Sequence, residues 1–523
     1  MAADNCNKYS EWDAYRQFKM RKENACFQLK QLYKEYWPTN GDEYAIPQFI
    51  GMYSKFLPHD EFGRVLPEAY EKLRKALITR NNNLLFQVPL GGSLKLTQPL
   101  AGLSINLAGP ASSSIYMPPP PSMSSDQSAG EMVIDYCHVL ARDVPFIDYP
   151  TDPVIANCVT YISALPVYTG QKPVTVDNVF RSKGVGCEVG PYISQLLYMP
   201  VKIWPDVIAP LHTFPTHTAA NDRLITEASF LAAQNGSPIG TEPTISATPT
   251  YITCGRDLAY YVTNDIISDI YDITVRVLLQ ANAPFSPTNP YTKPPYNINM
   301  HSFINWNVED VSACLRLAGQ ISMRGGWYPK WQIYRRLRPE EFGGEVEQWR
   351  LTGQNPANIS QVLLTSDVLA DIFTVQGNYY LAQTNKSGSP GHPAYPSGHG
   401  VFSGACGTVI KAFYDEDWVF PNPVIASSDG LSLVATTDVL TLGHEINKLM
   451  ENVGIGRNWA GFHYDSDCTA GILYGEKIAY LVLQDWIEQY PEKNVSFRFH
   501  SYQGDEIVIE PRTKYGSILT IPK

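Results

Sequence analysis

The sequence predicts a mainly α-helical protein with long loops and a small β appendix at its C-terminus. Apolar residues recur at helical spacing in many charged segments, whereas the stretches between them are rich in Pro, Gly and Ser. Only the tail alternates like strands, with apolar pairs at Phe497/Phe499 and Ile507/Ile509. The 523 residues, 44% of them hydrophobic and 17% charged, suffice for two or three domains or one large body.

Residues 1–255 are expected to form a helical and loop-rich N-terminal region. Its irregular segment 81–123 ends in a run of four prolines, which indicates a surface or an interface. From residue 145 onward the region is rich in Pro, Thr, Gly and Tyr. The periodic segments predict helices at 11–36, 65–80 and 125–141.

Residues 256–490 are expected to form a second, helical domain, followed by a β-like tail at 491–523. The small residues Gly400, Gly404, Ala405 and Gly407 share one helical face, which allows another backbone to approach closely. The predicted helices of this domain are 257–280, 307–322, 360–374, 398–414, 437–453 and 459–489.

Charge and composition exclude several functional classes. A net charge of −11 argues against nucleic acid or an anionic membrane surface as partner. The chain shows neither a secretory signal nor an apolar run of membrane-spanning length, so we expect a soluble, intracellular or cytoplasmic protein, with secretion left open. Its nine cysteines include no C-x-x-C pair, which argues against a thiolate metal site. We expect no haem, flavin or nicotinamide cofactor.

The first segment that suggests chemistry carries Lys330 and Arg338. If the segment is helical, the two cations lie about two turns apart, and Pro339 is expected to stop the helix. A lysine point charge and an arginine fork together suit an oxyanion. The alternative is a pair of surface charges, and the run Arg335–Arg336 alone is typical of a solvated helix face.

The second segment is Pro396-Ser397-Gly398-His399. A Ser-Gly pair that opens a helix can donate a hydroxyl and free N–H groups to an anion, with support from the helix dipole. His399 follows close enough to exchange protons with that anion. The alternative is a helix cap followed by an ordinary histidine.

The third segment contains Arg457, His463 and Asp467. His463 and Asp467 are four residues apart, so on a helix they share one face, and the carboxylate can fix the tautomer of the imidazole. Alone, such a pair is more often a helix-surface hydrogen bond. The three segments together predict an enzyme site for phosphate or a phosphate-shaped oxide.

These motifs resemble the signature shared by vanadium-dependent haloperoxidases and the type 2 phosphatidic-acid-phosphatase superfamily. Gly456 stands where the phosphatase form has a serine, and the spacing of eight from Lys330 to Arg338 resembles the marine algal and cyanobacterial bromoperoxidase branch. Further similar stretches extend the resemblance over most of residues 35–490: 49–61, 96–102, 141–146 and 190–195.

The resemblance implies an orthovanadate cofactor with His463 as the axial ligand of vanadium. It implies that His399 acts as the acid–base group, that Asp467 orients His463, and that His392 lies near the halide. Trp327 stands where red-algal relatives tend to carry Arg and chloride-oxidising ones an aromatic, so bromide and iodide are the expected halides, with chloride left open. The residues implied to hold the vanadate oxygens are Lys330, Arg338, Ser397, Gly398 and Arg457.

The resemblance also implies a fold with two four-helix bundles in its core and assembly into homo-oligomers, from a dimer to a dodecamer, with N-terminal irregular segments at the interfaces. Hydrogen peroxide would oxidise halide to hypohalous acid, which halogenates a small organic acceptor. Two alternatives remain: a soluble acid phosphatase with His463 as nucleophile, and a non-enzymatic oxyanion-binding protein.

Overall fold

The protein is mainly α-helical, as predicted. The computed structural model describes residues 4–30, 37–203, 207–209, 212–238, 240–512 and 519–520. The α-helices within them are α1 Asp4–Leu29, α2 Asp42–Ala45, α3 Pro67–Ile78, α4 Asn82–Leu85, α5 Asp126–Ala141, α6 Pro153–Ser163, α7 Glu227–Gln234, α8 Gly255–Tyr261, α9 Ile267–Gln280, α10 Tyr296–Asn299, α11 Val308–Tyr328, α12 Pro339–Thr352, α13 Gln361–Leu364, α14 Val368–Gln376, α15 Gly398–Phe413, α16 Leu442–Trp459 and α17 Asp465–Trp486. The strands are β1 Val201–Ile203, β2 Val207–Ala209, β3 Val424–Ala426, β4 Leu433–Ala435, β5 Phe497–His500, β6 Glu506–Ile509 and β7 Leu519–Thr520.

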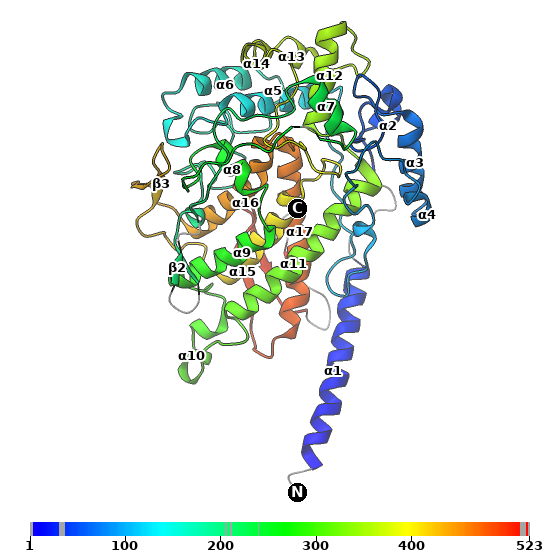
Figure 1. Ribbon diagram of the computed structural model, residues 1–523. Helices are drawn as coiled ribbons and strands as arrows, with labels where there is room; N and C mark the ends of the chain where they lie inside the picture. Colours follow the sequence, from blue (N-terminus) through cyan, green and yellow to red (C-terminus); the bar gives the residue numbers. More distant parts are fainter. Residues whose placement is uncertain are drawn as a thin grey trace.

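Four long helices of the C-terminal half form a bundle at the centre of the molecule (Figure 1). Within it α15 packs against α11, α16 and α17, while α11 and α16 each also contact α17. Side chains between them are almost wholly buried, for example Leu315, Val409 and Leu449. Removal of this apolar surface from water stabilises the bundle. The bundle holds the site residues in place because these residues lie at or near the ends of its helices.

A second group of helices packs beside this bundle. At its centre α5 contacts α6, α13 and α14, and it also reaches α12 and α16. Nearly every residue of α5 from Ser128 to Ala141 is buried, which is typical of a helix surrounded by other elements. The predicted fold class, helical bundles with long loops, is therefore confirmed.

Glycines let α15 and α17 approach each other closely. A Cβ atom at Gly404 would overlap the backbone oxygen of Ile472, and one at Gly475 would overlap the backbone oxygen of Val401. Because glycine has no Cβ, the two backbones meet without an intervening side-chain layer. This contact fixes the N-terminal end of α15 against that of α17, where two of the three predicted segments lie.

Two helices that the sequence predicts as continuous are interrupted. The segment 257–280 contains α8 and α9, separated at residues 262–266, and the segment 360–374 is divided into α13 and α14. Both breaks contain Thr, Asn, Asp or Ser, whose side chains compete for backbone hydrogen bonds and so favour turns. The apolar periodicity continues across each break, so it could not reveal either.

The predicted β appendix is present at the C-terminus. There β5 pairs antiparallel with β6, which pairs antiparallel with β7, and the other two sheets have two strands each. In the first pair Phe497 lies opposite Ile509 and Phe499 opposite Ile507, and all four side chains are buried. Among the helices described, none combines the length and the apolar run required to cross a lipid bilayer.

Candidate active site

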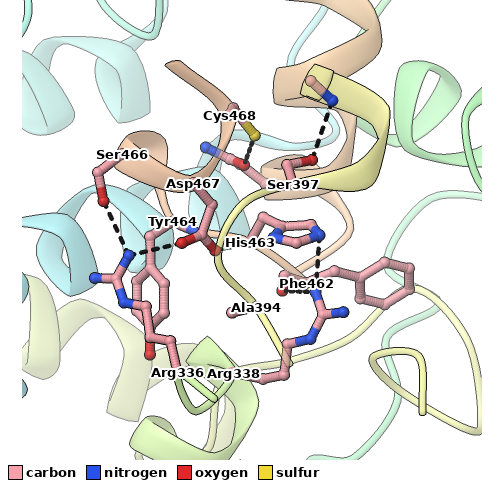
Figure 2. Close-up of polar contacts among 12 residues, drawn as sticks. Arg336, Arg338, Ala394, Ser397, Phe462, His463, Tyr464, Ser466, Asp467 and Cys468 are labelled. Atoms are coloured by element: carbon pink, nitrogen blue, oxygen red, sulfur yellow. Dashed lines mark hydrogen bonds and ion pairs between the residues drawn. The ribbon is translucent and has the colours of Figure 1, made fainter. Parts of the chain in front are cut away.

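Residues from the three predicted segments meet in one buried cluster. Lys330 and Arg338 lie between α11 and α12, Arg457 lies near the end of α16, and His463 lies in the loop that leads to α17. Ser397 is the N-cap of α15. These five residues are at most 7% exposed, so a ligand among them would be largely shielded from water. Figure 2 shows Arg338 directed at His463, with Ser397 close by.

Direct hydrogen bonds join the segments. One guanidinium nitrogen of Arg338 donates to Nε2 of His463 at 2.8 Å, and the other donates to Nδ1 of His392 at 2.9 Å. The ammonium of Lys330 donates to the backbone oxygen of Pro393 at 2.7 Å. The first segment is thus held against His463 of the third segment and against residues shortly before the second, although 54 and 125 residues separate Arg338 from His392 and His463.

The path from Lys330 to Arg338 is not the straight helix that the sequence suggested. After α11 a π-helical stretch spans Pro329–Tyr334, Arg335 adopts a left-handed conformation with φ 44°, and Arg338 is the N-cap of α12. Pro339 therefore begins a helix and does not stop one, since proline suits the first helical position as well as the position after a helix. The bend turns Lys330 and Arg338 toward one site.

The run Arg335–Arg336 is buried, so its interpretation as a solvated helix face was wrong. Arg335 pairs with Glu43 at 2.8 Å, and Arg336 pairs with Glu131 at 2.7 Å. Both glutamates come from distant parts of the chain. The burial of these arginines depends on partners that the local sequence does not contain.

The hydrogen bonds of His463 define its tautomer. Arginine can only donate, so the Arg338 contact requires Nε2 of His463 to accept, and Nδ1 donates to a carboxylate oxygen of Asp467 at 2.9 Å. Burial and the neighbouring cations hold the pKa of His463 well below its usual value. The pair does not lie on a helix as predicted, because Tyr464 is the N-cap of α17 and His463 precedes it, yet the contact forms.

His392 is neutral for the same reason. Its Nδ1 lies 2.9 Å from a guanidinium nitrogen of Arg338, which can only donate, and 3.3 Å from the Pro393 carbonyl, which can only accept. The shorter contact favours Nδ1 as the acceptor and places the ring proton on Nε2. Burial beside Lys330 and Arg338 holds the pKa of His392 well below the usual value. The ring contacts Trp327 at a centroid distance of 4.9 Å, and the Lys330 ammonium lies 5.4 Å from the centre of the Trp327 ring. His392 and Trp327 therefore lie at the edge of the cation cluster, by which we mean Lys330, Arg338 and Arg457.

His399 has a carboxylate partner that sequence reasoning missed. Its Nε2 lies 3.1 Å from Asp265, in the break between α8 and α9, and in the same break the Val262 carbonyl accepts from Arg457 at 2.7 Å. Burial and then Arg457 lower the pKa of His399, while Asp265 opposes this shift. With a side chain 18% exposed, His399 is the most accessible of the predicted site residues. No motif in residues 262–265 could have indicated this contact.

The start of α15 provides neutral donors. The Ser397 oxygen accepts from the backbone N–H of Gly400 at 3.3 Å, which leaves its hydroxyl proton free to donate elsewhere. The N–H of Gly398, in the first turn, has no acceptor within the helix. A Cβ at Gly398 would lie 3.1 Å from the Trp327 ring, so a side chain there would crowd the indole.

Within the described residues, no carboxylate forms an ion pair with the cation cluster. Burial, followed by mutual repulsion, lowers the pKa of Lys330 well below its usual value, and the pKa of Arg457 is lowered to about 10. The nearby Asp467 already pairs with Arg336 at 2.7 Å. Within the described part of the chain, Nε of Arg457 is buried without a hydrogen-bond partner. Three buried positive charges, together with this unpartnered donor, favour a bound anion.

A tetrahedral oxide such as vanadate or phosphate fits these donors. Such an ion has several oxygens that can each accept a hydrogen bond. The donors available are the arginine guanidinium groups, the lysine ammonium, the serine hydroxyl and the N–H groups at the start of α15. The unprotonated Nε2 of His463 is a donor atom suited to a metal or a phosphorus centre. Fold and cluster together define a helical-bundle protein with a buried cation cluster suited to an oxyanion.

Comparisons with known proteins agree with this class. A family model described as the VCPO second helical-bundle domain matches residues 369–491. A vanadium-dependent bromoperoxidase from Ascophyllum nodosum is 30% identical over 87% of this chain and 86% of its own length. A second vanadium-dependent bromoperoxidase, from Corallina officinalis, is 28% identical over 91% of this chain and 93% of its own.

Among solved structures, the homohexameric second vanadate-dependent bromoperoxidase from Ascophyllum nodosum resembles this chain with a TM-score of 0.90. The two are 26% identical, and the similarity covers 97% of this chain and 93% of that one. The chain therefore belongs to the vanadium-dependent haloperoxidase family.

The buried charges predict that an oxyanion stabilises the protein. Orthovanadate or phosphate at a hundred times its dissociation constant should add about 2.7 kcal/mol to the free energy of unfolding, whereas chloride at equal ionic strength should not. The measurement is the thermal midpoint by differential scanning calorimetry. Lys330→Met removes one uncompensated charge, so this variant should gain less from the oxyanion. Equal gains in both proteins would contradict an anion held by Lys330.

Proposed function

We propose that this protein uses hydrogen peroxide to oxidise bromide or iodide to hypohalous acid, which then halogenates a small organic acceptor. The observation that carries the proposal is the unprotonated Nε2 of His463 beside three buried cations. The vanadium-dependent bromoperoxidases that cover most of this chain support the same activity. They do not favour the phosphatase alternative, although a site of this kind also suits phosphate.

In the proposed holoenzyme, Nε2 of His463 would bond to vanadium in place of its hydrogen bond from Arg338, and the Asp467 carboxylate would hold the opposite side of that ring. Vanadate, when bound, supplies a Lewis acid that makes a peroxide oxygen electrophilic toward halide. The charges of the cation cluster strengthen this effect in a site shielded from water. The residues that would hold the vanadate oxygens are Lys330, Arg338, Ser397, Gly398 and Arg457.

His399 is suited to move protons during the reaction. Its lowered pKa keeps the ring neutral near pH 7, so that it can accept a proton from peroxide. The Asp265 carboxylate at 3.1 Å then stabilises the imidazolium that forms. Its partial exposure supports exchange of that proton with solvent.

The test is halogenation of a dye by the purified protein with orthovanadate, hydrogen peroxide and bromide. His463→Ala should abolish turnover, since the nitrogen bonded to vanadium is lost, whereas His212→Ala removes a buried histidine outside the cluster and should retain it. Absence of vanadate-dependent turnover, combined with rapid hydrolysis of a phosphomonoester by vanadate-free protein, would support the phosphatase instead.

We further propose that His392 and Trp327 contact the halide. The Nε2–H of His392 can donate a hydrogen bond to an anion, and the Trp327 ring offers a polarizable surface next to it. Both residues are buried, so a halide there would lose most of its water. Bromide is more strongly hydrated than iodide and depends more on a replacement donor.

His392→Ala is therefore expected to lower kcat/KM for bromide more than for iodide. A loss of one hydrogen bond to a buried anion corresponds to about 1.5–3 kcal/mol, or roughly a 10- to 150-fold lower kcat/KM for bromide. Steady-state assays with each halide at fixed peroxide measure the two ratios. Equal losses for both halides would place His392 away from the halide.

We also propose that the chain assembles with copies of itself, as the homohexameric relative from Ascophyllum nodosum does. Helix α1 extends away from the body in Figure 1, and its Tyr15, Phe18 and Leu29 side chains are more than half exposed. Leu107, on the loop that faces α1, is fully exposed. Exposed apolar residues gathered in this way favour a protein partner.

Light scattering coupled to size-exclusion chromatography should give a mass of at least two chains. Phe18→Glu with Leu107→Glu should lower that mass, because both charges would lie in the interface. Arg498→Glu, on the exposed face of β5, is the control and should leave the mass unchanged. A monomeric parent protein would contradict the proposed assembly.

A further inference from the structure

Behind His463, on the side opposite the cation cluster, lies a second layer of buried charges. Arg336 donates to one carboxylate oxygen of Asp467 at 2.7 Å and to the Ser466 hydroxyl at 2.9 Å. The other oxygen of Asp467 accepts from Nδ1 of His463 at 2.9 Å. Figure 2 shows Asp467 between Arg336 and His463. Each oxygen of this carboxylate therefore has a fixed partner.

Arg336 is itself held from α5. Its other terminal nitrogen donates to Glu131 at 2.7 Å, and the second Glu131 oxygen accepts from the backbone N–H of Ser466 at 2.9 Å. The guanidinium carbon lies 3.8 Å from the centre of the Tyr464 ring. Glu131 and Arg336 are at most 4% exposed. Glu131, which is 335 residues from Ser466 in the sequence, thus holds the first turn of α17.

This layer controls two groups of the site at once. Because Arg336 binds one oxygen of the Asp467 carboxylate, this group cannot rotate freely, and its other oxygen stays directed at Nδ1 of His463. The backbone oxygen of Asp467 also accepts from the N–H of Ser397 at 2.9 Å, which ties the start of α15 to the same residue. Loss of Arg336 would release the carboxylate and leave a buried charge without compensation.

We infer that Glu131 and Arg336 are positioning residues that fix the Asp467 carboxylate and thereby hold His463 as the Nδ1–H tautomer with Nε2 available to the oxyanion. The nature of that oxyanion rests on the proposed function, but the tautomer does not. Among the described residues, neither of the two forms a hydrogen bond with the cation cluster, and both act through Asp467.

The chain contains a matched control pair. Arg335 is adjacent to Arg336 in sequence, is equally buried, and pairs with a glutamate, Glu43, at 2.8 Å. Its hydrogen bonds reach Glu43, Tyr70 and the Trp331 carbonyl, none of which touches His463 or Asp467. Variants of the Arg335–Glu43 pair therefore report the effect of losing a buried ion pair alone.

The first experiment measures the dissociation constant of orthovanadate by equilibrium dialysis. Glu131→Gln and Arg336→Gln should raise it by about 10- to 100-fold, as expected for partners of a metal ligand. Glu43→Gln and Arg335→Gln should leave the dissociation constant close to the wild-type value. All four variants should lower the thermal midpoint, because each breaks a buried ion pair. Arg336→Lys retains the charge and should recover part of the lost affinity. Similar affinities in the two sets of variants would overturn the inference.

The second experiment reads the tautomer without vanadate. In protein labelled with ¹⁵N-histidine, solid-state NMR distinguishes protonated from unprotonated ring nitrogens, and His463→Ala identifies the His463 signals. Wild type and Glu43→Gln should give one Nδ1–H form, and Glu131→Gln a mixture. An unchanged His463 spectrum in Glu131→Gln would refute the positioning role. If Glu131→Gln gives a mixed spectrum but the wild-type protein does not bind orthovanadate, the proposed function is refuted and this inference stands.

Discussion

The burial of like charges is the constraint on which the rest of this structure depends. Lys330, Arg338 and Arg457 lie where water cannot screen their repulsion, and unpaired buried charge is unstable unless other groups compensate it. Their hydrogen bonds within the described residues go to neutral acceptors, namely main-chain oxygens and the imidazoles of His392 and His463. A bound anion would supply the negative charge that these acceptors do not. The accepting carbonyls belong to Val262, His392, Pro393, Ala394 and Phe462.

Several carboxylates near the site are already paired with other cations. Glu340 pairs with Lys55, Glu43 with Arg335, and Glu131 with Arg336, each at 2.6–2.8 Å and each largely buried. Because these carboxylates neutralise other cations, they do not neutralise the cation cluster. Each ion pair also holds a distant segment at the edge of the site. The same ion pairs therefore position the site and preserve its charge.

The sequence allowed prediction of the residues whose chemistry is local. Local sequence alone indicated that Ser397 and the glycine after it open a helix. The spacing of four residues likewise indicated the contact between His463 and Asp467. Asp265 and Glu131 could not be found in this way, because each is a single carboxylate without a motif, and its partner lies more than 130 residues away. Pro339 was misassigned because proline is favoured both at the first position of a helix and after its end. The helices were predictable from periodicity and the bundles from the family resemblance, but the breaks that bring Asp265 and Arg338 to the site were not.

The site belongs to the whole chain and not to one helical bundle. The segment matched by the second-bundle family model, residues 369–491, contains Ser397, Arg457 and His463 but neither Lys330 nor Arg338. Glu131 lies in the N-terminal region, so its contact with Ser466 crosses the domain boundary that we place at residue 255, a division that stays a prediction. A matched segment by itself would keep the imidazole and one cation but would lose the partners that orient and charge the site. An oxyanion site of this kind therefore requires both halves of the chain to fold against each other.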